Sequence, residues 1–249
     1  PVSLAIGKPL STHEETNSMN SAPANAPKNS SAKLWIAVAA AVVLLAGGGA
    51  AGFMMLPSKA PWGSKLLSSE NLTTDPPRPG TWSMSGDTLE ITPKAVVLWT
   101  KKPYENFQLD FEVQIPKGGN SGVFLCSPST RAKPSQFLEF DLSDANPSDR
   151  NTGGGALVNV KIPESPLNIA DGNWHRFSVL AKGRSITFSH NGKDLYTCDL
   201  SQWTRAGFNP DGTKNPYKIP LKDFPMKGHI GFQGYLGTAK YRNIAIKEL

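Results

Sequence analysis

Residues 107–115 read Phe107-Gln-Leu109-Asp-Phe111-Glu-Val113-Gln-Ile115, so that apolar and polar side chains alternate over the whole stretch. A period of two is the signature of a β-strand, because successive side chains point to opposite faces. We therefore expect one face of this strand in a core and the other in water. The break at Pro116-Lys117-Gly118-Gly119 ends the strand.

Similar signals continue on the C-terminal side of this strand. Asn191-Gly192 lies between two short apolar runs and predicts a type I′ hairpin, because both central residues of that turn need positive φ. One helical turn is expected near 201–203, and 207–227 is expected to be a long loop that borders a binding site. The remaining strands are expected at 121–126, 136–142, 174–181, 185–189, 195–196, 228–233 and 241–246. Strands without intervening helices exclude parallel α/β folds and predict an all-β, two-sheet antiparallel sandwich.

The N-terminal part of the chain has a different character. Residues 1–33 are rich in Ser, Asn, Ala and Pro and predict a disordered leader. Residues 34–56 carry no charge and are long enough for one transmembrane helix. A cleaved signal peptide and a buried soluble helix are the alternatives. Residues 57–65 are expected to be a linker, and 66–249 the folded domain. Lysines on both sides of the span leave its orientation undecided, and the chemistry below favours an extracytoplasmic domain.

Composition excludes several classes of protein. The chain has 26 Lys+Arg against 20 Asp+Glu, and this formal charge of +6 is too mild and too dispersed to predict a nucleic-acid partner. Two cysteines exclude a disulfide scaffold and a multi-cysteine zinc site. Cys126 and Cys198 lie in strand-like runs, so buried free thiols are expected, with a bridge outside the cytoplasm as the alternative.

The most informative polar cluster lies between residues 137 and 144. On a strand, Glu139 and Asp141 share a face, whereas Asp144 joins them only if a bulge or turn intervenes. Converging carboxylates repel one another, so the pKa of at least one rises, which produces the acid and base of glycoside chemistry. A site for a divalent cation is the second interpretation, and a solvated strand face is the third.

Other candidates are weaker. The glycines of 153–155 allow close backbone approach to a ligand or a tight crossing, and a flexible hairpin loop is the third interpretation. Trp203 and Tyr217 lie in expected loops and could stack on sugar rings. Three histidines of the domain lack metal-ligand spacing, and each is expected to be a hydrogen-bonded structural residue: His175, His190 and His229.

An ordered set of motifs resembles the 3-keto-disaccharide hydrolase domain family over residues 66–249. The motifs are Gly119-Asn120-Ser121-Gly122-Val123-Phe124, the 139–144 block, Thr152-Gly153, Asp171-Gly172-Asn173-Trp174, Asn191-Gly192, and 228–233 with 241–244. The resemblance implies a concanavalin A-like jelly roll. It also implies cleavage of 3-keto-glucosides, either by hydrolysis or by β-elimination and hydration.

The resemblance also implies roles for individual residues. Glu139, Asp141 and Asp144 would supply the base or the metal ligands, while His229 and Gln233 would orient the sugar. The chain departs from the family pattern at three positions: Asp141 replaces a usual Gln, Cys126 a common Arg, and Tyr235 a common His.

These departures keep a non-catalytic, lectin-like module open as the alternative to a membrane-anchored sugar-active enzyme. A structural adhesion sandwich is a third, weaker alternative. The 139–144 block is also similar to the Glu-x-Asp-x-x-Glu strand of laminarinase-type glycoside hydrolases, with an Asp one methylene short at the last position.

Overall fold

The computed structural model describes residues 64–66, 68, 70–92, 96–146, 149 and 151–249. The predicted leader and the predicted span at 34–56 lie outside these residues. Among the residues described, no helix is both long and apolar enough to cross a bilayer.

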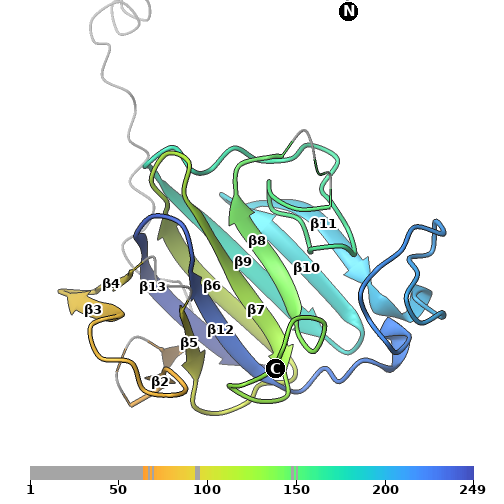
Figure 1. Ribbon diagram of the computed structural model, residues 1–249, viewed down its shortest axis with the longest axis horizontal. Helices are drawn as coiled ribbons and strands as arrows, with labels where there is room; N and C mark the ends of the chain where they lie inside the picture. The colour runs from red at the N-terminus through yellow and green to blue at the C-terminus, as the bar shows by residue number, and fades with distance from the viewer. Residues whose placement is uncertain (1–63, 67, 69, 93–95, 147–148, 150) are drawn as a thin grey trace, which may run out of the picture. The chain divides into compact units, whose positions relative to one another are not determined.

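Two antiparallel sheets form the domain, and Figure 1 shows one in front of the other. The eight-stranded sheet has the order β11-β10-β9-β6-β13-β4-β3, with β1 also paired to β13. Its strands are β1 (Ser64–Lys65), β3 (Trp82–Ser85), β4 (Thr88–Ile91), β6 (Phe107–Gln114), β9 (Trp174–Lys182), β10 (Ser185–His190), β11 (Lys193–Asp199) and β13 (Ala239–Glu248).

The front sheet has the order β2-β5-β12-β7-β8. Its five strands are β2 (Leu72–Thr73), β5 (Val96–Thr100), β7 (Asn120–Ser127), β8 (Leu138–Ser143) and β12 (His229–Gly234). Two 3₁₀ turns, η1 (Leu200–Gln202) and η2 (Leu221–Asp223), interrupt the segment between β11 and β12. The two-sheet antiparallel sandwich expected from the sequence is confirmed.

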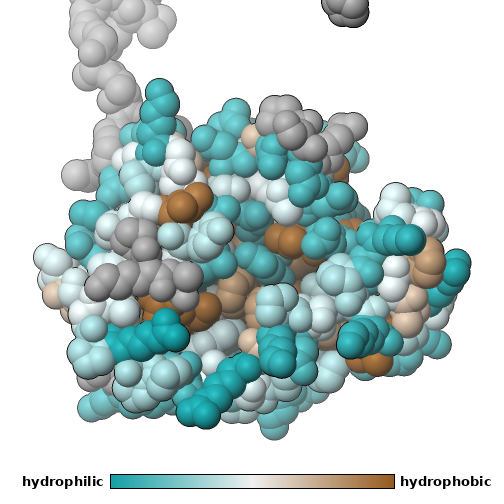
Figure 2. Space-filling view, in the orientation of Figure 1, coloured by the Kyte–Doolittle hydropathy of each residue, from teal (hydrophilic) through white to brown (hydrophobic). Residues whose placement is uncertain are grey.

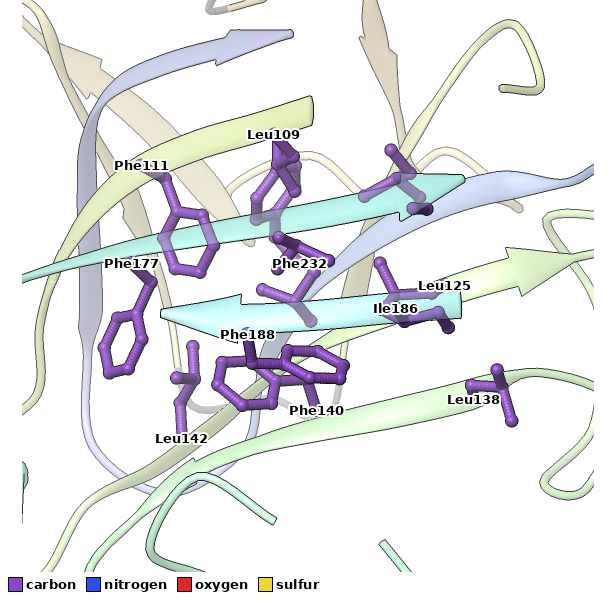
Figure 3. Packing of buried hydrophobic residues seen from close by; sticks show 14 of the residues in the cluster. Leu109, Phe111, Leu125, Leu138, Phe140, Leu142, Phe177, Ile186, Phe188 and Phe232 are labelled. Carbon is purple, nitrogen blue, oxygen red and sulfur yellow. The ribbon is translucent and has the colours of Figure 1, made fainter. Parts of the chain in front are cut away.

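The core lies between the sheets and is filled by alternate residues of facing strands. Figure 3 shows Phe111 and Phe177 of the eight-stranded sheet together with Phe140 and Phe232 of the five-stranded sheet. The Phe140 ring stacks on Phe188 with centroids 4.4 Å apart. The inward face of β8, which carries Phe140, is thus fixed in the core, and its other face must point away from it.

The expected strands from residue 107 onward are confirmed. The Asn191-Gly192 turn joins β10 to β11 with φ of 49° and 82°, as a type I′ turn requires. The expected helical turn near 201–203 is a 3₁₀ turn. The short strands β1 to β5 were not expected individually, and β1 falls inside the predicted linker 57–65, where it pairs with β13.

The polar face of β6 was expected in water, and that expectation is wrong. Asp110 and Glu112 are each only 2% exposed. The strand lies between β9 and β13, and Arg242 of β13 donates from Nε to Glu112 Oε2 at 2.6 Å. Arg176 of β9 lies 3.9 Å from Asp110. Cations from both neighbouring strands make burial of these carboxylates tolerable.

Candidate functional site

The outer face of the five-stranded sheet carries the candidate site. On β8, Leu138, Phe140 and Leu142 are buried in the core, so the alternating side chains of Glu139 and Asp141 lie on the outer face. This sheet faces the viewer in Figure 1. Figure 2, in the same orientation, shows apolar side chains in the middle of this face and hydrophilic ones around them.

Glu139 occupies an apolar part of this face. It is paired across the strands with Phe124, which stacks on Phe137 at 4.3 Å and packs with Trp99 in a small cluster separate from the main core. Burial, with a smaller contribution from the Asp141 charge, raises the pKa of Glu139 to about 7. The carboxyl is therefore poised to take up or release a proton near neutral pH.

Asp141 has hydrogen-bond donors that Glu139 lacks. Its Oδ2 accepts from the Gly153 backbone N–H at 3.0 Å, and its Oδ1 accepts from the Ser143 hydroxyl at 2.8 Å. Burial raises the pKa of Asp141, while these two hydrogen bonds oppose the rise. The two neighbouring carboxyls are thus made chemically unequal by their surroundings.

The glycine run holds the donor to Asp141 in place. Gly153 has φ of +74°, and a Cβ there would come within 2.3 Å of the Asp144 carbonyl oxygen. The Gly154 N–H donates to the Ser143 carbonyl at 3.0 Å. Of the three interpretations of 153–155, a tight crossing fits the structure, and it supports Asp141.

Gln233 reaches the same region from β12. Its Oε1 is buried and has no hydrogen-bond partner. Both this atom and Glu139 Oε1 lie 3.4 Å from the point where a Cβ on Gly122 would sit. The amide of Gln233 and the carboxyl of Glu139 therefore converge over one glycine of the intervening strand β7.

Asp144 does not join the other two acids. Its Oδ1 accepts from the Ala170 N–H at 2.8 Å, so the side chain fixes the loop that leads to β9. Within the described part of the chain, no group of three or more His, Cys, Asp or Glu side chains could hold a metal ion. The described residues therefore contain no three-acid metal site, and one Asp144 oxygen is bonded to backbone beyond the end of β8.

A cavity of about 420 Å³ adjoins this face at the end of β8. Its lining includes Asp141, Ser143 and Asp144, together with Asn120 and Thr152, but not Glu139. Asp141 is thus the group that connects the open cavity with the more enclosed region around Glu139.

Comparison with known proteins identifies the family of this chain. The family model for the 3-keto-alpha-glucoside-1,2-lyase-like domain matches residues 70–247. The chain belongs to this family. The suspected resemblance is thereby confirmed, and the match covers Glu139, Asp141, Gly122 and Gln233.

Two further comparisons agree with the family. A 3-keto-disaccharide hydrolase of Bacteroides thetaiotaomicron is 25% identical, over 59% of this chain and 59% of the relative. The chain thus matches about three fifths of that protein's length. A crystal structure of a candidate glycosyl hydrolase from Parabacteroides distasonis has a TM-score of 0.69 and 28% identity, covering 76% of this chain and 100% of that one. A second protein from that species, 18% identical with a TM-score of 0.55 over 72% of this chain and 89% of its own, shares the fold.

Two aromatic residues expected to stack on sugar are buried in this family member. Trp203 and Tyr217 are 5% and 4% exposed and belong to the main core. Trp203 Nε1 donates to Asn209 Oδ1 at 2.8 Å, and the Tyr217 hydroxyl donates to the Phe137 carbonyl at 3.1 Å. The segment that carries them packs inward, so neither ring offers a face to a ligand.

The two remaining candidates lie at different ends of β12. Tyr235 follows the strand and is 49% exposed. His229 opens the strand, and its Nδ1 donates to the Thr100 carbonyl at 2.8 Å. Gln233 lies four positions after His229, which is about 13 Å along a strand. The structure therefore brings Glu139, Asp141 and Gln233 together and leaves His229 apart.

Sequence reasoning missed Ser143 as part of the site, and it found Gly122 only through the family motif that contains it. It also treated the histidines separately, whereas His175 Nδ1 lies 3.0 Å from His190 Nε2, and His175 Nε2 lies 3.0 Å from Asp171. Hydrogen-bonded structural roles for His175 and His190 agree with this network.

Both cysteines are free and buried. Burial raises the pKa of each thiol to about 12. A thiol held in this way is a poor nucleophile, so neither cysteine is a candidate catalytic residue.

Proposed function

We propose that the domain cleaves the glycosidic bond of 3-keto-glucosides, with Glu139 as the group that moves the proton. The carrying observation is a carboxyl on the outer sheet face whose pKa is raised to about 7 by burial, beside an Asp141 that has its own hydrogen-bond donors. The substrate class comes from the family to which the chain belongs. Two carboxyls with unequal environments are the usual basis for separate acid and base roles.

The chemistry of the ketone explains why one base suffices to start the reaction. The carbonyl at C3 acidifies the hydrogen on C2, and ionised Glu139 takes that proton. The electron pair of the C2–H bond forms a C1–C2 double bond while the C1–oxygen bond breaks. The leaving oxygen takes the proton that Glu139 has gained and departs as an alcohol, which leaves Glu139 ionised again. Addition of water to the double bond then gives the same net outcome as hydrolysis.

Release of the alcohol from a 3-keto-glucoside tests this proposal. Methyl 3-keto-α-glucoside is incubated with the protein, and methanol is measured over time. Glu139→Gln is expected to lose at least about 100-fold in kcat, because the amide cannot take the proton. Glu164→Gln, in an exposed loop, is the matched control and keeps the rate. A Glu139→Gln variant with full turnover would contradict the assignment.

A non-catalytic sugar-binding module is the second candidate. It is favoured by the placement of Asp144, because one of its carboxylate oxygens accepts from the Ala170 backbone N–H and so supports a loop. Under this alternative, calorimetry shows saturable binding of the keto-glucoside, no methanol is released, and Glu139→Gln changes affinity alone.

We further propose that residues 34–56 anchor the chain in a membrane, with the domain outside the cytoplasm. The support is the uncharged length of that segment. Fractionation of cells that express the full chain, followed by protease treatment of intact spheroplasts, tests both parts. Recovery in the soluble fraction contradicts the anchor, and protection of the domain contradicts the orientation.

A further inference from the structure

Gly122 differs from Gly231 and Gly234 of the same sheet in the room that a side chain would have. A Cβ on Gly231 would lie 2.6 Å from Val97 and 2.7 Å from the Trp99 ring, and a Cβ on Gly234 would lie 2.5 Å from Ile91. Packing therefore demands glycine at both positions. At Gly122 the nearest atoms would be 3.3 to 3.4 Å away, which a methyl group can nearly accept.

Backbone conformation does not demand glycine at 122 either. The residue lies within β7 and is absent from the glycines with positive φ. A glycine inside a strand weakens it, and a common reason for its presence is close approach of a ligand. Because Gly122 has no side chain, there is space over β7, which lies between β12 and β8.

The three atoms nearest to that Cβ position are all oxygens. They are the Phe140 carbonyl at 3.3 Å, Gln233 Oε1 at 3.4 Å and Glu139 Oε1 at 3.4 Å from the Cβ position. Gln233 Oε1 is buried and lacks a partner, so it pays the cost of desolvation without a hydrogen bond. A group that enters over Gly122 must therefore bring a hydrogen to donate.

We propose that Gly122 is the floor of a subsite for one hydroxyl group of the sugar, which donates its hydrogen bond to Gln233 Oε1 beside Glu139. This inference rests on the proposed function and adds a specificity rule to it: a sugar lacking that hydroxyl leaves the Gln233 oxygen buried and unpaired. Sites that hydrogen-bond a substrate hydroxyl in this way discriminate strongly against the deoxy analogue. Because Glu139 Oε1 borders the same space, the hydrogen bond to Gln233 holds the sugar beside the ionised carboxylate that acts as the base.

A comparison of deoxy sugars in two variants tests the subsite. Methyl 3-keto-α-glucoside and its 2-, 4- and 6-deoxy analogues are measured on the full chain, as kcat/KM or as Kd where there is no turnover. The variants are Gln233→Leu, which removes the acceptor, and Gly122→Ala, which fills the space. Thermal unfolding of each variant shows whether the fold is kept.

The expected result is selective. In the wild type, kcat/KM or affinity for one deoxy analogue is lower than for the parent sugar by about tenfold or more, and in Gln233→Leu the difference is less than twofold. Gly122→Ala lowers kcat/KM or affinity for the parent sugar at unchanged thermal stability. Equal losses for every analogue in the wild type and Gln233→Leu, or an unaffected Gly122→Ala variant, would overturn the subsite even if turnover is normal. A wild type that neither binds nor cleaves any of the four sugars refutes the proposed function, and the subsite with it.

Discussion

Replacement of Glu139 by Gln should make the protein more stable at alkaline pH. The wild-type carboxyl is held among Phe124, Phe137 and Asp141, where its charged form lacks the solvation that it has in the unfolded chain. Glutamine has nearly the same shape and never carries the charge. The substitution therefore removes an electrostatic penalty while it removes the proposed proton acceptor.

The magnitude follows from the difference between the folded and unfolded states. The pKa of Glu139 is about 7 when folded against a usual 4.5. A folded pKa above the unfolded value means that stability is complete below pH 4.5 and falls as pH rises through 7. At about 1.4 kcal/mol for each pH unit, the full penalty above pH 7 is roughly 3 kcal/mol. Because part of the carboxyl contacts solvent, we expect about 2 to 3 kcal/mol.

Thermal and urea unfolding of the full chain at a series of pH values measure this effect. The difference between Glu139→Gln and wild type should grow by about 2 to 3 kcal/mol from pH 4.5 to pH 8. For a domain of this size, that corresponds to a change in Tm of roughly 5 to 10 °C. A constant offset between the two proteins is irrelevant, because only its change with pH reports the carboxyl.

The same unfolding measurements at each pH provide the control and the outcome that would refute the reasoning. Glu164→Gln replaces an exposed carboxyl and should run parallel to wild type at every pH. If Glu139→Gln also runs parallel to wild type from pH 4.5 to 8, Glu139 is ionised at little cost. The account of a carboxyl poised by burial would then be wrong, whatever the protein's activity.

Three further predictions concern the support of the fold and the site. Arg242→Leu leaves the Glu112 carboxylate buried without its cation and should cost about 3 to 5 kcal/mol in urea unfolding. Gly153→Ala places a Cβ within 2.3 Å of a carbonyl at positive φ and should cost at least about 2 kcal/mol, with activity lost as the donor to Asp141 shifts. Burial lowers the pKa of His190 to about 4 from 6.5, so the folded state favours the neutral ring. The free energy of unfolding therefore has its full value above pH 6.5 and should fall by about 1 to 2 kcal/mol as pH falls to 4. In the Glu139→Gln background, His190→Gln should remove this loss of stability between pH 6.5 and pH 4. If the loss is unchanged, it does not come from His190.

Local sequence was sufficient where neighbours along the chain decide the structure. The alternation over 107–115 predicted β6, and Asn191-Gly192 predicted the turn between β10 and β11. The same alternation placed Glu139 and Asp141 on one face of β8, away from Phe140. These features depend on residues within about ten positions of each other, so one sequence contains what is needed.

Local sequence failed where the partner is remote in the chain. Glu112 was expected in water because nothing near it signals Arg242, which arrives from β13. Trp203 was expected at a ligand because its segment has the composition of a loop, and only the packing against the core shows the ring buried. Asp144 was expected to join the other acids only if a bulge or turn intervened, and a backbone N–H at Ala170, remote in the chain, holds one of its oxygens. Such errors arise from tertiary contacts that override local pattern.

The unequal treatment of Glu139 and Asp141 follows from where β8 ends. Asp141 lies near the end of the strand, where the returning glycine run can bring a backbone N–H to it at 3.0 Å. Glu139 lies two residues further into the sheet, where the Val158 N–H of the returning segment donates to its backbone carbonyl at 2.9 Å and its side chain lies opposite Phe124. One strand therefore presents a carboxyl with donors and a carboxyl without them, on the same face. The position of a loop crossing, and not the identity of the acids, decides which of the two carboxyls has donors that oppose the rise of its pKa.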